Sequence, residues 1–582
     1  MSQWLQISIA LRVQDTNLAV ETLLRISDPA SPEYGQYLSA TEVARLFKPN
    51  DNAIPGVLKW LSDSGIDQSY ISFSHGGSHL SLYLPTQKAA LLLQTTFYHQ
   101  IHPETRQERI ACQYYHIPQP LTESIDYILT TTSIPTHQQT PQQQIIPNDQ
   151  VNAPAPLLQD CHEISTLGCL RALYGIPQDV LPHPNNSFGI FEPSWYSWRP
   201  EDLDMFFEAV NKSDLMGRRP KIDAINGGYL QREKPEDYWY REPDLDFEYA
   251  MALVSPHEVT NIEVGSQNQI GNLKDMLAAF DRYYCDPVHP DHKKCPPSYP
   301  PGCNTTHCEC GSLSPPKVLS ISWGWPEAAF TSEYIQRQCI EFLKLGLMGT
   351  TVIASVSDHG TASGGGAPCI DDEIGNGTSG RFSPTFPASC PWVTSVGGTQ
   401  MLHSSTPGIP TTDRIEKVYR KLSFDTLNTS GGGFSNVFSA PPYQAPHIAS
   451  YNDIEKDHLD TIRSRFNNTG RGFPDVSARA DSYLIALDRK WEFVSGTSAS
   501  SPVFASIITL INSERMNSGK GPVGFINPVL YAKPDILNDV MIGLNEGCGI
   551  NEAFRATGGW DAVTGLGTPN YKRMRDLFMS LP

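Results

Sequence analysis

A run of small residues, Ser495-Gly496-Thr497-Ser498-Ala499-Ser500-Ser501-Pro502, has the composition needed to expose a nucleophilic hydroxyl group. Gly496 permits a tight turn, and the stretch from Ala499 to Ile511 predicts a buried helix directly behind it. The first turn of a helix carries unpaired N–H groups and a partial positive charge, which stabilise a developing oxyanion. We therefore predict that Ser498 is a nucleophile. A small-residue helix start packed against a sheet is the alternative that this motif alone leaves open.

An acidic run from Glu242 to Leu253 contains a candidate base. Pro243 followed by acids predicts that a helix starts here, with Pro243 at a first helical position. The spacing of four places Glu242 and Asp246 on one face of that helix, whereas Asp244 points elsewhere. Two carboxyl groups that close tend to share a proton, so a serine with this base would act at acid pH. From the spacing alone, a solvated acidic helix end is the commoner explanation.

A third polar segment, Ser357-Asp358-His359, follows the apolar run Thr351–Ser355. His359-Gly360-Thr361 is similar to the histidine motif of subtilisins, which would make His359 the base. The first apolar run of this half ends in Glu192, however, where a subtilisin has an aspartate. Asp358 stands where subtilisins have an oxyanion-stabilising Asn, and a carboxyl group donates a hydrogen bond only when it is protonated. On the residues alone both interpretations stay open: His359 as a base, or Asp358 as an oxyanion donor at low pH with His359 as a bystander.

The elements that position these residues fall into two parts joined by a segment rich in Gln and Pro. Residues 1–132 mix predicted strands and helices, residues 133–158 predict a flexible linker that contains a processing site, and residues 159–582 alternate in an α/β pattern. Short apolar runs of the latter part are typical of buried parallel strands. The predicted strands are Gln6–Leu11, His79–Leu84, Phe188–Phe191, Val318–Trp323, Thr351–Ser355 and Trp392–Val396, and the predicted N-terminal helices are Leu18–Ile26 and Thr41–Phe47.

Over nearly its whole length, the chain resembles the sedolisin family of serine-carboxyl peptidases. The segments that carry the resemblance are Ser27–Leu38, Cys169–Tyr174, Glu242/Asp246, Ser320–Gly324, Asp358, Phe386–Thr399, Ser430–Ser435, Pro474–Ser477 and the Ser498 motif. The resemblance implies a subtilisin-like α/β catalytic domain with a central parallel sheet, preceded by an α+β activation domain. It implies that Ser498 attacks, Glu242 takes the proton, Asp246 tunes Glu242, and Asp358 stabilises the oxyanion with the N–H of Ser498. The family usually has Gly where this chain has Ser357.

The same resemblance implies two further sites. Ser322, Trp323 and Gly324 would bind an extended substrate strand, with a side-chain pocket beside them. One Ca²⁺ ion would be held near the C-terminus by oxygen atoms, the ligands that Ca²⁺ prefers. The predicted calcium ligands are the carboxylates of Asp539 and Asp561 and the backbone carbonyls of Val540, Thr557 and Gly559.

Composition restricts the surroundings and partners of the chain. A formal net charge of −19 disfavours nucleic acid and anionic membranes as partners. Twelve cysteines and six Asn-X-Ser/Thr sequons favour secretion, with a lysosome or vacuole as the alternative. The start of the chain reads as a strand instead of a signal peptide, so we expect the precursor to begin upstream. In the cysteine-rich segment 285–310 we expect a disulfide-tied loop in preference to a zinc site.

Together these features predict an acid-acting serine-carboxyl peptidase that is made as a zymogen. We expect a monomer whose own N-terminal domain acts as intramolecular inhibitor and chaperone, and whose substrates are peptides or proteins. The sequence leaves open whether it removes tripeptides or cuts internally. A catalytically inactive peptide-binding relative and a neutral peptidase that uses His359 are the alternatives.

Overall fold

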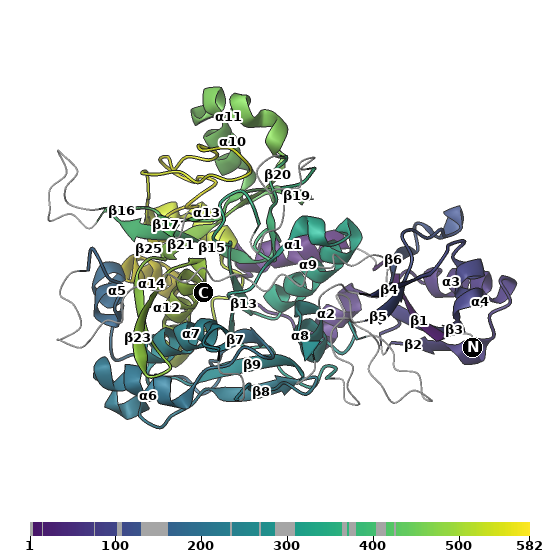
Figure 1. Ribbon diagram of the computed structural model, residues 1–582, viewed down its shortest axis with the longest axis horizontal. Helices are drawn as coiled ribbons and strands as arrows, with labels where there is room; N and C mark the ends of the chain where they lie inside the picture. The colour runs from purple at the N-terminus through teal and green to yellow at the C-terminus, as the bar shows by residue number, and fades with distance from the viewer. Residues whose placement is uncertain are drawn as a thin grey trace.

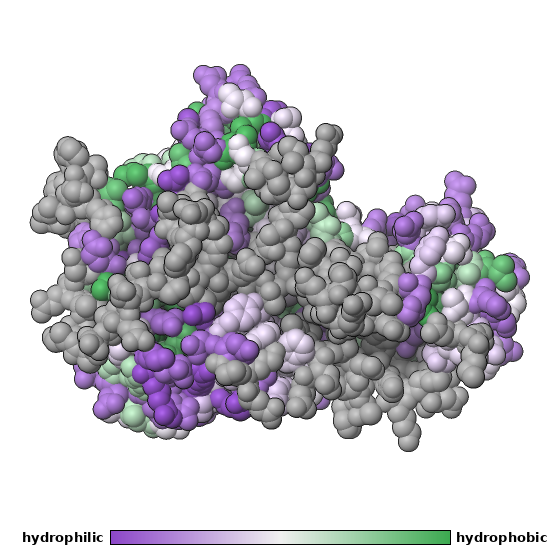
Figure 2. All heavy atoms as spheres, in the orientation of Figure 1, coloured by the Kyte–Doolittle hydropathy of each residue, from purple (hydrophilic) through white to green (hydrophobic). Residues whose placement is uncertain are grey.

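The computed structural model describes residues 4–13, 16–74, 76–101, 108–129, 161–232, 236–266, 269–285, 309–363, 369–371, 380–402, 415–423 and 426–582. The predicted linker, residues 133–158, lies outside this set. In the part of the chain described, no helix is both long and apolar enough to cross a membrane. On the face shown in Figure 2, hydrophilic residues cover the region around α6 and β8.

The N-terminal part forms an antiparallel sheet in the order β2-β3-β1-β6, at the right of Figure 1. Ile7, Ile9 and Leu11 of β1 point to one face of the sheet and are fully buried in one core, and Ser8 and Ala10 on the other face are buried as well. The predicted strands Gln6–Leu11 and His79–Leu84 are confirmed. The elements of this part are β1 (Trp4–Leu11), α3 (Ala53–Asp63), β2 (Ile71–Phe73), β3 (His79–Pro85), α4 (Thr86–Leu92), β4 (Tyr98–Ile101), β5 (Glu108–Ala111) and β6 (Ile125–Leu129).

Helices α1 (Thr16–Ser27) and α2 (Ala40–Leu46) connect this sheet to the rest of the molecule, and α1 packs against α9 (Ser332–Leu347). Tyr37, in the segment that carries the family resemblance, fits a notch between two left-handed glycines. Its hydroxyl donates to the Pro522 carbonyl at 3.0 Å. A Cβ atom added at Gly349 or Gly524 would lie within 2.6 Å of the Tyr37 side chain. The small-residue notch therefore fixes how the N-terminal part docks.

The C-terminal part is built on a nine-stranded sheet whose central strands are parallel. Its main order is β10-β9-β7-β11-β13-β15-β16, with β8 also paired to β9 and β21 to β15. The four predicted strands of this part are confirmed, with small shifts at their ends. The strands are β7 (Phe188–Pro193), β8 (Lys221–Ile225), β9 (Val259–Ser266), β10 (Gln269–Ile270), β11 (Val318–Ile321), β13 (Thr351–Ser355), β15 (Thr394–Met401), β16 (Glu416–Val418) and β21 (Val476–Arg479).

Both faces of this sheet are covered, which explains why its strands read as continuous apolar runs. Ile190 and Ile353 point into a core shared with α7 (Tyr238–Val254) and α12 (Thr497–Asn517). Their neighbours Phe191 and Val352 point into a second core, shared with α8 (Leu273–Phe280) and α9. The predicted α/β class with a central parallel sheet is confirmed.

The remaining elements surround these layers. They are α5 (Leu167–Tyr174), α6 (Pro200–Ala209), β12 (Trp325–Pro326), β14 (Thr385–Phe386), β17 (Arg420–Ser423), β18 (Thr426–Thr429), β19 (Gly433–Ser439), α10 (Ala445–Ile454), α11 (Lys456–Ile462), β20 (Gly470–Phe473), β22 (Tyr483–Leu487), β23 (Lys490–Val494), α13 (Asn527–Ala532), β24 (Leu537–Asn538), β25 (Thr568–Pro569) and α14 (Tyr571–Ser580), with short 3₁₀ turns η1 (Gln68–Tyr70), η2 (Gln119–Leu121), η3 (Ser213–Leu215), η4 (Glu327–Ala329), η5 (Arg463–Arg465) and η6 (Pro534–Ile536).

Disulfide bonds brace the C-terminal part at four places among the described residues. They join Cys161 to Cys169, Cys285 to Cys310, Cys339 to Cys390 and Cys369 to Cys548. The Cys285–Cys310 bond closes the cysteine-rich segment, as expected for a disulfide-tied loop. Cys295, Cys303 and Cys308 lie outside the described residues.

Candidate active site

Four segments bring polar side chains to the edge of the sheet where its parallel strands end. Ser322 follows β11 and Asp358 follows β13, while Ser498 lies in the first turn of α12. Helix α12 packs against both β11 and α7, and α7 carries Glu242 and Asp246. This edge is the usual position of ligand sites in open α/β sheets.

Helix α7 begins at Tyr238, upstream of Pro243. The prediction that Pro243 occupies a first helical position was therefore wrong. Proline lacks an N–H group, so it leaves the carbonyl four residues earlier, that of Trp239, without its helical donor. In this chain the backbone N–H of Ser197 donates to that carbonyl at 2.9 Å. A neighbouring loop thus replaces the missing hydrogen bond, and the helix continues through the proline.

The two faces of α7 carry carboxyl groups with different partners. Asp246 accepts a hydrogen bond from the Ser322 hydroxyl at 2.8 Å, and Glu242 interacts with the hydroxyls of Ser498 and Ser322. Asp244 lies on the other side of the helix and accepts from the backbone N–H of Arg199 at 2.8 Å. The spacing of four therefore brings Glu242 and Asp246 to the same side as Ser498.

The turn before α12 holds Asp358 against the start of the helix. The backbone N–H of Thr497 donates to Oδ1 of Asp358 at 2.6 Å. A Cβ atom added at Gly496 would lie 2.6 Å from Oδ2 of the same carboxyl group, closer than a Cβ atom approaches a non-bonded atom in real proteins. Glycine at 496 is therefore what allows Asp358 to lie beside the turn.

Ser498 is only 9% exposed. Its hydroxyl donates weakly to the Ser322 carbonyl at 3.4 Å. Pro502, one turn into α12, leaves the Ser498 carbonyl without a helical donor, and the Ser322 hydroxyl lies 3.3 Å from that carbonyl. Pro502 thus leaves the Ser498 carbonyl free to accept from Ser322, which follows β11.

The buried carboxyl groups have strongly perturbed acidity. Burial raises the pKa of Glu242 well above its ordinary value, the charge of Asp246 raises it further, and the Ser498 and Ser322 hydroxyls lower it in part. Burial likewise raises the pKa of Asp246, against the lowering effect of the Ser322 hydroxyl. This pair retains a proton at pH values where an exposed carboxyl group would have lost one.

A third carboxyl group, that of Glu192 in β7, adjoins this pair. It is fully buried, and its Oε2 accepts from the indole N–H of Trp323 at 3.1 Å. Burial first, and then the charges of Asp246 and Glu242, raise its pKa well above the ordinary range. In the sequence, Glu192 argues against a subtilisin but is not predicted as a site residue. Its place near the end of the first buried parallel strand was the signal that could have marked it.

The predicted substrate segment follows β11 directly. The side chain of Trp323 is 2% exposed and directed to Glu192, and that of Ser322 is directed to Asp246. Gly324 is partly exposed, and a Cβ atom there would lie 2.5 Å from the Thr385 side chain. The side chains of Ser322 and Trp323 are thus directed into the protein, toward two of the buried carboxyl groups.

Ser357, the residue at which this chain departs from the family pattern, adopts a left-handed conformation with φ of 82°. Its hydroxyl is buried and has no hydrogen-bond partner among the residues that the structure describes. The turn is fixed from outside, because Gly431 donates its N–H to the Ser357 carbonyl at 2.8 Å and a Cβ atom at Gly431 would lie 1.9 Å from the Val356 carbonyl oxygen. The packing thus imposes on a serine a conformation that favours glycine.

Replacement of Ser357 by Gly is expected to stabilise the protein by about 1 kcal/mol, because relief of strain and of the unpaired hydroxyl outweighs the entropy cost of glycine. The expected rise in Tm is about 2 °C. Ser518→Gly, at a position with φ of −91°, is the matched control and is expected to lower Tm. Equal changes in the two variants would contradict the assignment of strain to Ser357.

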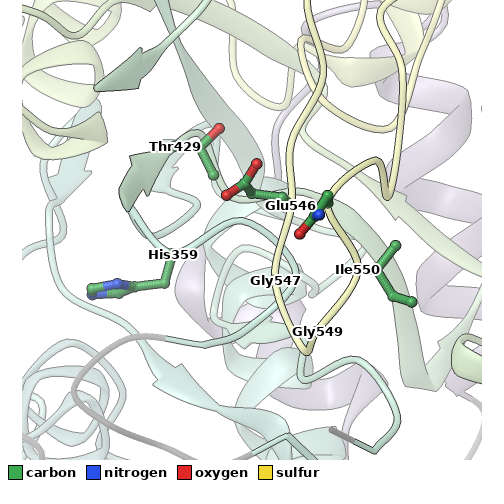
Figure 3. Close-up of a pocket in the computed structure, with 7 residues that line it drawn as sticks. His359, Thr429, Glu546, Gly547, Gly549 and Ile550 are labelled. Atoms are coloured by element: carbon green, nitrogen blue, oxygen red, sulfur yellow. The ribbon is translucent and has the colours of Figure 1, made fainter. Parts of the chain in front are cut away.

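His359 follows Asp358 and lines a separate cavity of about 200 Å³ together with Thr429 and Glu546 (Figure 3). Burial lowers the pKa of His359, and the charge of Asp358 raises it. Among the described residues, the side-chain contacts of Ser498 lead to Ser322 and Glu242. This arrangement favours Glu242 over His359 as a base.

The predicted calcium ligands come together near the C-terminus. The Gly559 N–H donates to Asp539 Oδ2 at 2.8 Å, and the Thr557 N–H donates to Asp561 Oδ2 at 3.2 Å. Asp561 is fully buried, and within the described part of the chain the buried Thr557 hydroxyl has no hydrogen-bond partner. Two carboxylates with neighbouring carbonyls, including that of Val540, fit a hard cation. No cluster of three or more His, Cys, Asp or Glu side chains suited to a metal occurs among the described residues.

An α/β fold with a serine at the start of a buried helix, and buried carboxyl groups packed beside it, defines the class of serine-carboxyl peptidases. Tripeptidyl-peptidase SED1 of Arthroderma otae is 38% identical to this chain, covering 99% of it and 93% of the relative. Aorsin of Aspergillus oryzae is 35% identical, covering 99% and 92%. The chain belongs to the sedolisin family and is a sedolisin-type serine-carboxyl peptidase.

Two further comparisons concern the domains. Residues 1–134 match the family model described as Pro-kumamolisin, activation domain, so the protein is a zymogen with an activation domain. Pseudomonas sedolisin, a serine-carboxyl proteinase solved with two molecules of pseudo-iodotyrostatin, aligns with a TM-score of 0.50 at 20% identity. The alignment covers 72% of this chain and 99% of the solved chain, and it shows that this chain has the subtilisin-like fold.

Proposed function

We propose that this peptidase works through Ser498, Glu242, Asp246 and Asp358. Ser498 Oγ forms a bond to the scissile carbonyl carbon as Glu242 takes its proton, and Glu242 then gives that proton to the leaving amine as the C–N bond breaks. Water attacks the resulting acyl-enzyme with Glu242 again as base, and Ser498 is regenerated. The observation that carries this proposal is the packing of α12 against α7, in which Ser322 contacts both Asp246 and Ser498 and buried Glu242 lies on the same helix face as Asp246.

Asp358 and the N–H of Ser498 stabilise the oxyanion in this mechanism. Burial raises the pKa of Asp358, so the protonated, hydrogen-bond-donating form persists to higher pH than in an exposed aspartate. The substrate strand pairs with the backbone of Ser322, Trp323 and Gly324. An acid optimum follows, because Asp358 is protonated and the Glu242–Asp246 pair carries one proton in the same pH range.

The site near the C-terminus would bind one Ca²⁺ ion, which the Asp539 and Asp561 carboxylates and the Val540, Thr557 and Gly559 carbonyls would hold. The ion would supply positive charge that stabilises the loop between Asp539 and Asp561, away from the residues proposed to cleave the peptide bond.

Removal of calcium with a chelator is expected to lower Tm by about 5 °C, because a bound ion stabilises only the folded state. Asp561→Asn is expected to lower Tm by a similar amount and to abolish the response to chelator. Differential scanning fluorimetry, with calcium or magnesium added back, measures both effects. A wild-type Tm that is indifferent to chelator, in protein free of bound calcium by elemental analysis, would exclude the site.

The domain organisation proposed is an activation domain over residues 1–132, a linker at 133–158 that is cut in acid, and a peptidase domain over 159–582. Before the linker is cut, the activation domain acts as an intramolecular inhibitor and chaperone. After the cut, the mature enzyme is a secreted monomer that acts on peptides. Because relatives such as SED1 are named tripeptidyl-peptidases, we propose tripeptide removal, with internal cleavage as the alternative. The disulfide bonds support secretion, into the medium or to a lysosome or vacuole.

The test is to express the chain behind an added signal peptide and acidify it from neutral to about pH 4. Mass spectrometry follows its processing and the cleavage of peptides with free and blocked N-termini, beside Ser498→Ala. Acid-dependent loss of the activation domain and cleavage, both absent in the variant, are expected. Cleavage restricted to free N-termini identifies tripeptide removal, and cleavage of blocked peptides identifies internal cutting. No cleavage by folded protein at any pH would establish the binding-only alternative.

A further inference from the structure

The Asn-X-Ser/Thr sequons of this chain are candidate sites of N-glycosylation, and the structure distinguishes them. An N-glycan is bulky and hydrophilic, and it is attached to the chain before folding is complete. A folded protein therefore carries glycans only on asparagines that reach solvent in the native structure. The sequons in the described part of the chain begin at Asn185, Asn211, Asn428 and Asn467, whereas those at Asn304 and Asn376 lie outside the described residues.

The first sequon lies in the loop between α5 and β7. Its second residue, Asn186, is held inward, because the side-chain amide donates to the Thr509 carbonyl and to the Ser513 hydroxyl of α12, both at 2.8 Å. The backbone N–H of Asn185 donates to the His183 ring at 3.2 Å, and the residue itself is exposed. Of two adjacent asparagines, the one that begins the sequon is thus the one that faces solvent.

The second sequon begins just beyond the C-terminal end of α6. Asn211 is left-handed, with φ of 57°, a conformation that asparagine adopts after helices. Its N–H donates to the Glu208 carbonyl at 3.1 Å, and the N–H of Lys212 donates to the Phe207 carbonyl at 2.8 Å, which closes the last turn. Asn211 and Ser213 of this sequon are both exposed, and the surface around α6 is hydrophilic (Figure 2).

Both exposed sequons lie at the edge of the sheet away from Ser498. Asn185 precedes β7, and β7, β11 and β13 are parallel, so β7 begins at the edge opposite to the one where Ser322 and Asp358 follow their strands. Strands β7 and β8 are both parallel to β9. Helix α6 between them therefore returns the chain to the starting edge, where Asn211 precedes β8. A glycan at either position lies away from the residues proposed to cleave the peptide bond.

The other two sequons have asparagines that are directed inward. Asn428 in β18 is 2% exposed, and the N–H of the next residue, Thr429, donates to the Asp358 carbonyl at 2.9 Å. The side-chain amide of Asn467 donates to the carbonyl of fully buried Ser435 at 3.1 Å. A glycan on either asparagine would displace packed groups, in the first case beside the turn that carries Asp358.

We propose that Asn185 and Asn211 are sites of N-glycosylation, and that Asn428 and Asn467 stay unmodified in the folded protein. The donor is a lipid-linked oligosaccharide diphosphate. The asparagine Nδ2 forms a bond to the anomeric carbon of the sugar as the bond from that carbon to the diphosphate oxygen breaks, and the amide loses one proton. The inference rests on the proposed secretory route and is independent of the proposed role of Ser498.

The test is to secrete the Ser498→Ala chain from a fungal host behind an added signal peptide, which keeps it from cutting itself. Digestion with peptide:N-glycosidase in water enriched in heavy oxygen turns each glycosylated asparagine into a labelled aspartate, and mass spectrometry of the peptides detects the label. We expect label at positions 185 and 211 and none at 428 or 467. Asn185→Gln and Asn211→Gln are each expected to lower the intact mass by one glycan. Thr469→Ala is the matched control, because it destroys the sequon of Asn467 and is expected to leave the glycan mass unchanged.

The outcomes separate the glycosylation sites from the proposed mechanism. An unlabelled Asn185 or Asn211 peptide from secreted, folded protein would overturn the assignment at that position, and label at Asn428 or Asn467 would overturn the argument from burial. Wild-type enzyme deglycosylated without unfolding is expected to keep its kcat/KM, and a loss would contradict the position of the glycans away from Ser498. The expected labels in a chain whose wild type cleaves no peptide would overturn the mechanism and leave the glycosylation sites in place.

Discussion

Replacement of Glu242 by Gln is expected to lower kcat about 10³-fold at the acid optimum, with a smaller effect on KM. A glutamine preserves the shape of the side chain but cannot accept the Ser498 proton or return it to the leaving amine. The variant is to be processed in trans by immobilised wild-type enzyme, so that a failure of self-cleavage is not mistaken for a failure of peptide hydrolysis. Initial rates on a chromogenic peptide between about pH 3 and 7, a range that spans the carboxyl and imidazole pKa values, provide the measurement.

Asp244→Asn is the matched control for Glu242→Gln. Asp244 is also a fully buried acid of α7, but its hydrogen bond goes to the backbone of Arg199, away from Ser498. We expect this variant to retain kcat within a few-fold, with any loss appearing in Tm. Wild-type rates in Glu242→Gln near neutral pH would instead show that His359 is the base, and equal losses in both α7 variants would point to damage of the helix.

The local sequence was sufficient to predict the position of Ser498 at the start of a helix and the strands that surround it. Small residues around Gly496 and continuous apolar runs such as Thr351–Ser355 are local patterns, and each corresponds directly to an element of the fold. The prediction of where α7 starts was wrong because the start depends on Ser197, a residue distant in the sequence. The N–H of Ser197 supplies the hydrogen bond that Pro243 cannot donate to Trp239, and no pattern within α7 records that contact.

The Glu192–Trp323 pair was missed for a related reason. The two residues are 131 positions apart, and they meet because β7 and β11 pair in parallel, with Phe191 opposite Ile321. Sequence spacing carries no information on that register. The conformation of Ser357 is a contrasting case: the absence of the family's glycine was visible in the sequence, whereas the left-handed φ that makes it costly was not.

Replacement of Asp358 by Asn is expected to extend activity to higher pH. Burial raises the pKa of Asp358, so in the proposed mechanism the wild-type carboxyl group is protonated below that pKa and donates to the oxyanion. As the pH rises through it, the group ionises, loses its proton and repels the oxyanion. An asparagine keeps an oxygen to accept from the Thr497 N–H and an amide N–H₂ to donate at every pH. The alkaline limb of the profile of kcat/KM against pH is therefore expected to shift upward, with acid activity retained within about tenfold.

Asp358→Ala, compared with Asp358→Asn, distinguishes the loss of the hydrogen-bond donor from the loss of the ionisable carboxyl group. It removes the oxyanion donor altogether, and a loss of about 10²–10³ in kcat is expected at all pH values, as for other single donors of this kind. Equal losses in the Asn and Ala variants would show that the side chain does not donate to the oxyanion. An unchanged alkaline limb in active Asp358→Asn would assign that limb to the Glu242–Asp246 pair, because the pKa values of these groups are also raised by burial. The two variants together thus decide which buried acid limits the enzyme as the pH rises.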